Sequence, residues 1–471
     1  MLMDSLLRDA FLVSLTAITA GPILAALLRS RLGALALSLA GLMGVASMAL
    51  YVASSGITVI MFRYLEAYPL SAFFLMLVSV VMALVELLAY RYSKFYHEVA
   101  IFMGFAFAGA FLVAAAASLL PIFIGLELLA LSTALMILLE GRRRTEAAVK
   151  IFIVSSIAIA LFSFALALVF NYDPNLALAL SAAPAGAFSE YVLLLSMGLF
   201  IAALGFEGAL FPFNLWIPDV YQGAPAYITA MMAGVNKKIA FLAIIEIVVA
   251  VFYSYSSVYS QVFFVLSILT MFFGNLLALT QRNVKRMFAY SSISQAGYIL
   301  IGLAAGTGYG LAASLFYIFA HAFMITGAFA IVLMLETMGI SSVEEYTGLY
   351  GRNRFVAVAL GILMLSMAGI PPFIGFFGKF LLFSSALYAH MALLALLGVI
   401  NSFISIYYYA RVMNAMFAAK RGRAIAQEPV VYLVVLAALA VVVFFGVYPQ
   451  PLMRISSIAA GSIKSAFVLF H

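Results

Sequence analysis

Apolar runs of about twenty residues follow one another along this chain, with only short polar stretches between them. A run of this length, wound as a helix, is long enough to cross the hydrocarbon core of a bilayer. Only 9% of the 471 residues are charged, whereas soluble domains are about a quarter charged. The sequence therefore predicts an all-α polytopic membrane protein, a single membrane domain over 1–471, with fourteen helices near residues 10–28, 33–55, 68–90, 98–116, 119–139, 147–170, 190–217, 225–252, 259–280, 285–304, 309–335, 354–388, 391–417 and 430–448.

The sequence also predicts the structure of the two ends of the chain. The first residues contain acids and lack a basic segment before the first apolar run, so the first span is expected to be retained rather than cleaved as a signal peptide. A moderately apolar stretch at 452–470, which contains Arg454 and Lys464, predicts a terminal interfacial helix.

Composition excludes several classes of site. The chain has no cysteine, which rules out thiolate-bound iron–sulfur clusters, thiolate zinc sites and disulfides. Its four histidines have no metal-ligand spacing, so we expect no metal, no cofactor and no catalytic residue. The net charge of +7 does not indicate nucleic-acid binding, because the basic residues are dispersed in short loops.

The distribution of these basic residues predicts the topology. Most of the basic residues outside the spans lie in the loops that follow odd-numbered helices, and the remaining loops and tails hold only Arg8, Arg63, Arg454 and Lys464. Cytoplasmic loops are enriched in Lys and Arg, so both termini are predicted to face outside. Sixteen of the 24 Lys and Arg follow odd-numbered helices, namely Arg29, Arg31, Arg91, Lys94, Arg142, Arg143, Arg144, Arg282, Lys285, Arg286, Arg352, Arg354, Arg411, Lys420, Arg421 and Arg423.

Two predicted helices contain proline in their interior. Helix 7 has Pro212, and helix 12 has Pro371 and Pro372, with the same Pro-Phe feature in both. Interior proline removes a backbone hydrogen bond, and at membrane depth such a break must face protein or water. Matching breaks in two halves indicate a transporter repeat, and five helices per half require the second to be inverted. The predicted repeats are helices 4–8, about 98–252, and helices 9–13, about 259–417.

Ionisable side chains lie inside the predicted spans. Each charge at mid-bilayer costs about 2.5–3.5 kcal/mol, so these groups must pair, be solvated or become neutral. The same conditions let a row of Lys and Glu side chains load and release protons. We therefore interpret the set as a proton pathway, formed by Glu127, Lys150, Glu207, Lys237, Lys238, Glu246, His321 and Lys379.

Three of these residues have an alternative, structural interpretation. Lys150 lies one turn inside a helix end and could extend to the interface. Glu246 could pair with Lys238 on the same helix. His321 could be a hydrogen-bonded core histidine or a member of a proton relay.

Several motifs resemble the antiporter-like membrane subunits of respiratory complex I, of membrane hydrogenases and of Mrp-type cation/proton antiporters. The resemblance extends over about residues 100–415, and the motifs are most similar to the subunit N (subunit 2) branch of this family. The motifs are Gly125-Leu-Glu-Leu, Glu146-Ala-Ala-Val-Lys150, Pro212-Phe-Asn-Leu-Trp-Ile-Pro-Asp-Val-Tyr-Gln-Gly-Ala-Pro225, Arg286-Met-Phe-Ala-Tyr-Ser-Ser-Ile-Ser-Gln-Ala-Gly-Tyr298 and Ala368-Gly-Ile-Pro-Pro-Phe-Ile-Gly-Phe-Phe-Gly-Lys-Phe380.

The resemblance implies roles for individual residues. Glu127 matches the family's helix 5 glutamate, Lys150 the lysine of the Glu-Ala-x-x-Lys run, Lys237 the helix 8 lysine, and Lys379 the helix 12 lysine that hands protons outward. Gln295 stands where many members have histidine, which removes one relay group. The family fold of fourteen helices with two inverted repeats agrees with the spans read from the sequence.

One position departs from the family pattern. Glu207 occupies the place of a lysine that pairs with the helix 5 glutamate, here Glu127. Two carboxylates cannot both ionise cheaply at short range. We therefore predict that Glu207 is protonated or paired with a lysine, either Lys150, Lys237 or Lys238.

The resemblance also implies partners and a location. It predicts a non-catalytic, proton-translocating subunit without a redox centre, in the cell membrane, among other membrane subunits, lipids and a peripheral arm with flavin and iron–sulfur subunits. The alternatives are a subunit of a membrane hydrogenase-type or Mrp-type complex, with Na⁺ as a second ion, and a scaffold subunit that does not conduct. An isolated transporter of organic solutes is a more distant alternative.

Overall fold

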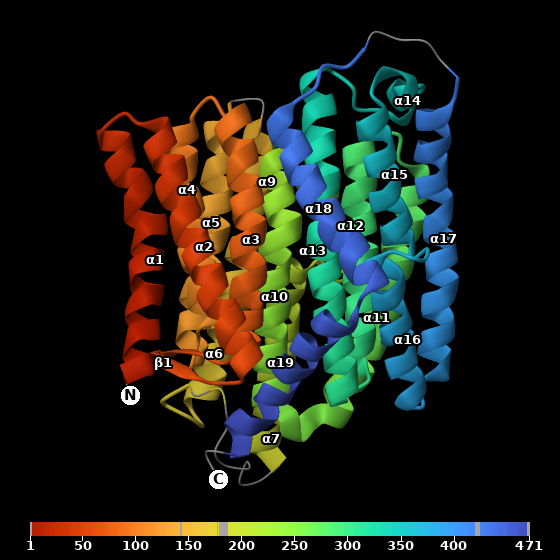
Figure 1. Cartoon of the computed structure of the whole chain (residues 1–471). Coiled ribbons are helices and arrows are strands. Elements are labelled where there is room, and N and C mark those ends of the chain that lie inside the picture. Colours follow the sequence, from red (N-terminus) through yellow and green to blue (C-terminus); the bar gives the residue numbers. More distant parts are fainter. Residues whose placement is uncertain (1, 142–143, 177, 179–186, 420–423, 469–471) are drawn as a thin grey trace.

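The computed structural model describes residues 2–141, 144–176, 178, 187–419 and 424–468 as a bundle of roughly parallel helices (Figure 1). The apolar runs form helices because a helix satisfies every backbone group within the segment. The first part of the chain forms α1 (Leu2–Leu27), α2 (Arg31–Ser55), β1 (Val59–Phe62), β2 (Leu65–Ala67), α3 (Pro69–Tyr92), α4 (Tyr96–Ala114), α5 (Leu119–Leu139), α6 (Thr145–Phe170), α7 (Ala187–Gly208), α8 (Ile217–Gly223), α9 (Ala226–Met231), η2 (Met232–Asn236), α10 (Lys237–Ile244) and η3 (Ile245–Val251).

The second part of the chain completes the bundle. It forms η4 (Tyr253–Tyr255), α11 (Ser256–Thr280), α12 (Val284–Ala304), α13 (Gly308–Thr337), η5 (Val343–Tyr346), α14 (Leu349–Arg352), α15 (Arg354–Ala368), α16 (Ile374–Tyr388), α17 (Ala392–Phe417), α18 (Pro429–Val447) and α19 (Gln450–Val468).

The number of crossings agrees with the sequence. Twelve helices of the described chain are long and apolar enough to cross a membrane. The eighth crossing consists of α9, η2, α10 and η3 in succession, and the twelfth consists of α15 and α16. The polytopic all-α fold with fourteen crossings is thus confirmed, while the inverted relation of the two five-helix halves stays a prediction.

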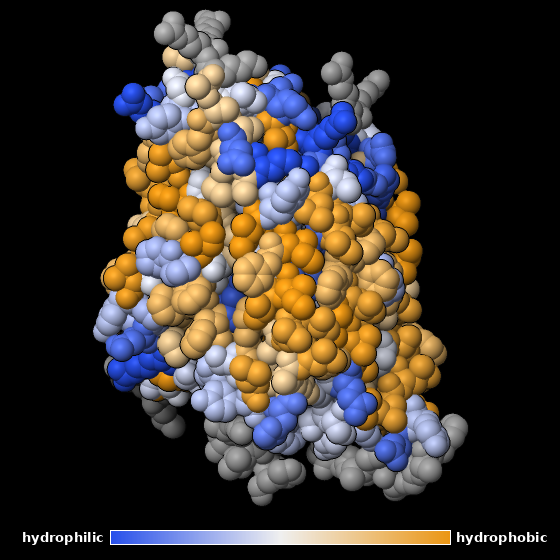
Figure 2. Space-filling view, turned by 90° about the vertical axis from the view of Figure 1, so that its right-hand side faces the viewer, coloured by the Kyte–Doolittle hydropathy of each residue, from blue (hydrophilic) through white to orange (hydrophobic). Residues whose placement is uncertain are grey.

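The surface has the polarity of a membrane protein. Figure 2 shows a broad hydrophobic area across the middle of one face of the molecule, with most hydrophilic residues toward the two ends. Helix α13 lies at the centre of the bundle and is completely buried within its apolar window. It packs against α12, α15, α16, α18, α19 and α9, so it joins the two halves.

A two-stranded hairpin was not expected from the sequence. Strands β1 and β2 pair antiparallel, with Val59 opposite Ala67, and they lie on the face that carries both chain ends (Figure 1). We call this the chain-end face. Strands of four and three residues are too short to produce a clear alternating pattern, which is why the sequence did not reveal them.

The expected terminal helix is present as α19. It packs against α13, α3 and α2. The last two positions of the predicted range, 469 and 470, lie outside the described residues, as do Arg142, Arg143 and residues 420–423 of the predicted basic loops.

Both predicted helix breaks are confirmed. Helix α7 ends at Gly208 and α8 begins at Ile217, so the chain is not α-helical around Pro212. In the same way α15 ends at Ala368 and α16 begins at Ile374, on either side of the Pro371–Pro372 pair.

Candidate functional site

The first break is held by hydrogen bonds that replace those lost from the helix. Ala209 has a positive φ of 69°, which turns the chain out of α7. The Phe211 amide donates to Thr270 Oγ1 at 3.0 Å, and the Trp216 indole donates to the Phe206 carbonyl at 3.2 Å. The break therefore lies against α11 and α7, within protein, as a non-helical segment at membrane depth requires.

The second break is organised around Lys379, which is 3% exposed. Its ammonium donates to the Ala368 carbonyl at 3.1 Å and to Ser402 Oγ at 3.0 Å, and it lies 4.5 Å from the centre of the Tyr298 ring. Ala368 is the last residue of α15, where the helix dipole favours a cation. This lysine thus has a structural partner that the sequence did not reveal, beside any role in transport.

The eighth membrane crossing, helix 8 of the sequence analysis, consists of α9, η2, α10 and η3 and is distinct from the short helix α8. It departs from α-helical geometry before and after its two lysines. The π-helical segment η2 ends at Asn236, immediately before Lys237, and the π-helical segment η3 contains Glu246. Wider turns of this kind occur often at functional sites, because they change the direction in which side chains project. Lys237, Lys238 and Glu246 are all at most 2% exposed.

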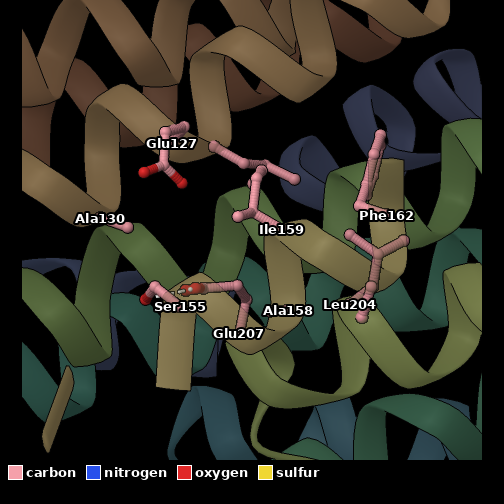
Figure 3. A pocket seen from close by; sticks show the side chains of 10 residues that line it. Glu127, Ala130, Ser155, Ala158, Ile159, Phe162, Leu204 and Glu207 are labelled. Carbon is pink, nitrogen blue, oxygen red and sulfur yellow. Dashed lines mark hydrogen bonds between the residues drawn. The ribbon is translucent and has the colours of Figure 1, made fainter. Parts of the chain in front are cut away.

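The two carboxylates of the first half face one cavity (Figure 3). Glu127 on α5 and Glu207 on α7 line this space, and Ser155 on α6 donates to Glu207 Oε1 at 3.0 Å. About 10 Å³ is open to the centre of a water molecule, which is room for about one water. A single water between the two acids would let a proton pass from one to the other.

Of the two forms of the Glu207 prediction, a lysine partner is wrong for the described residues, and a protonated Glu207 stays a prediction. None of their ion pairs includes Glu207, and its hydrogen-bond donor is the neutral hydroxyl of Ser155. Lys150 is held at a different place, in ion pairs with Glu146 and Asp219. The reason is geometric, because Lys150 lies close to the start of α6 and Ser155 is more than a turn further along it.

Lys237 is the next ionisable residue after Glu207 on the path from the first half toward the second. The two residues line a second cavity, together with Asn236 and Tyr221, which again has room for about one water. The Lys237 ammonium donates to Ser292 Oγ at 2.7 Å and to the Ser292 carbonyl at 3.1 Å on α12. Lys237 therefore faces the first half through the cavity and contacts the second half through its hydrogen bonds.

Lys238 forms a direct bond between the two halves. Its Nζ lies 2.6 Å from Nδ1 of His321 on α13, and both side chains are completely buried. A hydrogen bond needs one donor and one acceptor, so one of these two nitrogens carries no proton on the shared axis. With Nδ1 as acceptor, the ring proton lies on Nε2, which has no partner among the described residues.

A chain of neutral polar groups continues into the second half. Tyr317 donates to Gln295 Oε1, and Gln295 Nε2 donates to the Met367 carbonyl at 3.3 Å, next to the α15–α16 break. Gln295 thus lies between the centre of the bundle and the region of Lys379, although it cannot itself hold a proton as a histidine could.

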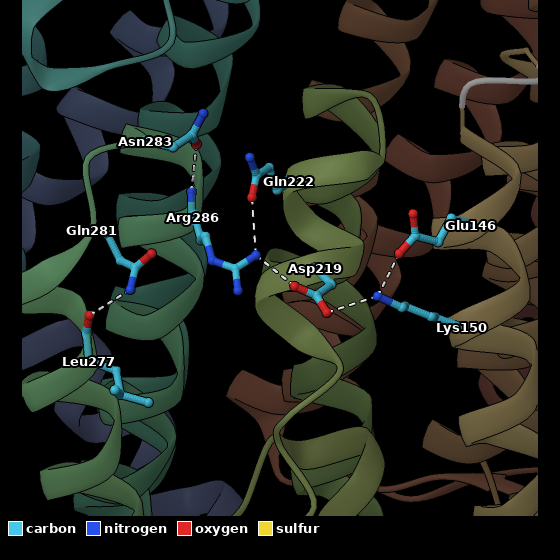
Figure 4. A network of polar contacts seen from close by, with 8 residues as sticks. All are labelled: Glu146, Lys150, Asp219, Gln222, Leu277, Gln281, Asn283 and Arg286. Carbon is cyan, nitrogen blue, oxygen red and sulfur yellow. Dashed lines mark hydrogen bonds and ion pairs between the residues drawn. The ribbon is translucent and has the colours of Figure 1, made fainter.

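Lys150 belongs to a separate ion network that links α6, α8 and α12 (Figure 4). It contacts Glu146 at 2.7 Å and Asp219 at 2.9 Å, and Arg286 contacts the other Asp219 oxygen at 2.6 Å. Asp219 on α8 therefore joins α6 of the first half to α12 of the second. The motifs around Asp219 and Arg286 were visible in the sequence, but nothing in them indicated that the two would meet.

Glu246 does not pair with Lys238. Its Oε1 accepts a hydrogen bond from the Tyr68 hydroxyl at 3.0 Å, and its Oε2 has no partner among the described residues. The alternative that Glu246 is a structural partner for Lys238 is therefore wrong, because Lys238 is turned toward α13.

Metal ligation has no support in the described part of the chain, where no group of three or more His, Asp or Glu side chains could hold an ion. The ionisable residues instead form a row of pairs and single groups. This arrangement suits transfer of protons between neighbours.

Known proteins share both the sequence pattern and the architecture. NADH-quinone oxidoreductase subunit N of Trichlorobacter lovleyi is 38% identical over 66% of each chain. A chain of respiratory complex I from Thermus thermophilus, solved with bound aureothin, superposes with a TM-score of 0.82 at 28% identity, over 95% of this chain and 99% of that one. A chain of the membrane-bound sulfane sulfur reductase, an archaeal respiratory membrane complex, gives a TM-score of 0.88 at 27% identity, over 98% and 97%.

These structural relatives are subunits of multi-subunit membrane complexes. Residues 116–405, which contain both helix breaks and the ionisable residues from Glu127 to Lys379, match the family model described as "NADH:quinone oxidoreductase/Mrp antiporter, TM". This match covers more than half of the chain. The protein is therefore a member of the NADH:quinone oxidoreductase/Mrp antiporter transmembrane family.

Proposed function

We propose that this protein is a proton-translocating, antiporter-like subunit of a complex I-type respiratory assembly. It moves protons along a row of buried and partly buried Glu, Lys and His side chains, and electron transfer in other subunits drives the movement. The subunit itself carries out no redox chemistry.

The bond between Lys238 and His321 carries this proposal. Two buried basic side chains at 2.6 Å have no packing advantage over two apolar ones. They do form a site that holds a shared proton, with one nitrogen on helix 8 and the other on α13. Such a site connects the two halves of the protein, and a structural scaffold would not need it.

The remaining groups extend the row on either side of this bond. Glu127, Glu207 and Lys237 are joined by two cavities that each have room for about one water. On the other side Lys379 is the last buried cation, 3% exposed beside the α15–α16 break. We place proton release at Lys379 and proton loading at the carboxylates of the first half.

Lys150 has a different part in this scheme. It lines an open polar space of about 360 Å³ with Glu146, Asp219, Gln222 and Arg286. We place it at the entrance on the face opposite the chain ends, where it binds α6 to α8, rather than within the buried row.

The orientation follows from the basic loops. Both termini face outside, and the face that carries α14 is cytoplasmic. In this arrangement the subunit lies in the cell membrane among further membrane subunits and lipids, and a peripheral arm with flavin and iron–sulfur subunits supplies the energy from a distance.

One observation favours a second candidate, an Mrp-type cation/proton antiporter subunit. Glu127, Glu207 and Ser155 place oxygen atoms around one small cavity, and oxygen ligands are those that hard cations prefer. Na⁺-dependent uptake that disappears in Glu207→Gln would support this alternative over proton transport alone.

The proposal is tested by Lys238→Met in the purified complex reconstituted into liposomes, with Lys94→Met as the control. Lys94 is exposed in the loop after α3, so the same substitution there leaves the row intact. We expect Lys238→Met to lower proton translocation per electron by at least fivefold and Lys94→Met to leave it unchanged. Full translocation by an assembled Lys238→Met complex would reject the proposal and favour the scaffold function.

A further inference from the structure

We propose that Glu246, Tyr68 and Glu66 form a second proton outlet that opens on the chain-end face, beside hairpin β1–β2. This inference rests on the proposed function, because it gives the first half of the row its own connection to the outside.

The hydrogen bonding of Glu246 is incomplete in either protonation state. The side chain is 1% exposed, and its only hydrogen bond among the described residues comes from Tyr68 at 3.0 Å. As a carboxylate it has one donor for two oxygens, and as an acid its proton on Oε2 has no acceptor. Buried polar atoms are rarely left in this way unless water or a transferred proton reaches them.

Tyr68 is suited to pass a proton on. A phenol hydroxyl both donates and accepts, so it can take a proton from an acid on one side while it releases its own on the other. Tyr68 is 8% exposed and lies between the hairpin and α3, as the residue that precedes the first turn of that helix. It therefore connects the interior of the bundle with the surface loop.

Glu66 provides the outer end. It lies on β2, opposite Ile60, two residues before Tyr68, and it is only partly buried. Its negative charge contributes to the electrostatic environment of both Tyr68 and Glu246. Partial burial raises the pKa of the Glu66 carboxyl above its ordinary value, so this acid can bind and release protons nearer to neutral pH.

The source of protons lies on the same helix. Glu246 follows Lys238 by eight residues, which is about 12 Å along a helix axis. Helix 8 runs from α9 toward the chain-end face, where the hairpin lies (Figure 1). The acid thus stands between the central lysines and the hairpin, whereas Lys379 lies in the other half of the protein.

The variants separate a relay from a structural anchor. Glu246→Gln keeps the shape of the side chain and an oxygen that accepts from Tyr68, so it removes the proton-carrying group alone. Tyr68→Phe removes the bond and the relay together. Glu190→Gln is the matched control, since it makes the same change in an exposed residue at the start of α7 that has no part in the outlet.

The experiment measures proton translocation per electron by the complete complex in liposomes, together with infrared difference spectra on addition of the electron donor. We expect Glu246→Gln and Tyr68→Phe each to lower translocation at least twofold, with assembly and thermal stability of Glu246→Gln unchanged. The carboxylic C=O band that changes on reduction should vanish in Glu246→Gln, whereas both this band and proton translocation should be unchanged in Glu190→Gln.

Unchanged translocation in Glu246→Gln, while Lys238→Met abolishes it, would overturn the second outlet and leave the proposed function intact. Unchanged translocation in both variants would instead reject the proposed function itself. A loss of assembly in Tyr68→Phe with full pumping in Glu246→Gln would assign the pair to structure, which also overturns the inference.

Discussion

Replacement of Lys379 by methionine separates a transport role from a structural one. Methionine retains most of the aliphatic length of lysine and removes only the ammonium group. In the wild-type protein this group makes two hydrogen bonds, to the Ala368 carbonyl and Ser402 Oγ, and contacts the Tyr298 ring. The ring contact and the two bonds are the interactions that the substitution removes.

The net effect on stability is modest because several terms oppose each other. Hydrogen bonds to a charged donor contribute about 1.5–3 kcal/mol each, and the cation–π contact about 0.5–2 kcal/mol. Against this, a charge at bilayer depth costs about 2.5–3.5 kcal/mol. The Ala368 carbonyl also keeps a hydrogen bond from Ser402 at 3.0 Å, so the variant leaves no unpaired carbonyl there. These contributions together predict that the free energy of unfolding falls by about 0–5 kcal/mol, with a midpoint near 3 kcal/mol, which permits assembly.

Transport should respond far more strongly. Methionine cannot hold a proton, so the row would end before the α15–α16 break. We expect proton translocation per electron to fall at least tenfold in the assembled complex, measured in liposomes with a pH-sensitive dye. Ser402→Ala is the structural control, because it removes one of the same hydrogen bonds and keeps the ammonium group. Full translocation by assembled Lys379→Met, or an equal loss in Ser402→Ala, would refute the reasoning.

Two further predictions concern the first half and the topology. Glu207→Gln should lower proton translocation while thermal stability stays unchanged, since the amide oxygen still accepts a hydrogen bond from Ser155. The control Glu190→Gln, at an exposed position on the same helix, should have no effect. Full translocation by Glu207→Gln would show that this carboxylate is dispensable. In this cysteine-free chain, an impermeant thiol reagent applied from outside should label a cysteine introduced at position 254 and not one at position 143, whereas the reverse pattern would invert the proposed topology.

The sequence by itself determined the crossings, the two breaks and most of the ionisable residues within the spans, although it did not indicate that Glu86 and Lys285 are buried. Each of these follows from local physics. Insertion into a bilayer depends on the hydropathy of about twenty consecutive residues, and a proline such as Pro212 interrupts a helix wherever it occurs. An ionisable residue such as Glu127 in an apolar run is visible without knowledge of its neighbours.

Features with weak local signals escaped the sequence. Hairpin β1–β2 is too short to show a strand period, and the π-helical segments η2 and η3 have the same apolar composition as the α-helix around them. Segment η2 ends immediately before Lys237 and η3 contains Glu246, and these positions depend on how the eighth crossing packs in the bundle.

Only the tertiary structure decided which charged groups meet. Lys238 bonds His321, 83 residues away, and Lys150 pairs with Asp219, 69 residues away. The sequence had offered Glu246 as one alternative for Lys238, and Lys150 as one of three candidate partners for Glu207. A side chain's nearest partner depends on the rotation of its helix about its own axis and on which helices pack against that side. Those quantities are set by the packing of the whole bundle around α13, and no local stretch of sequence contains them.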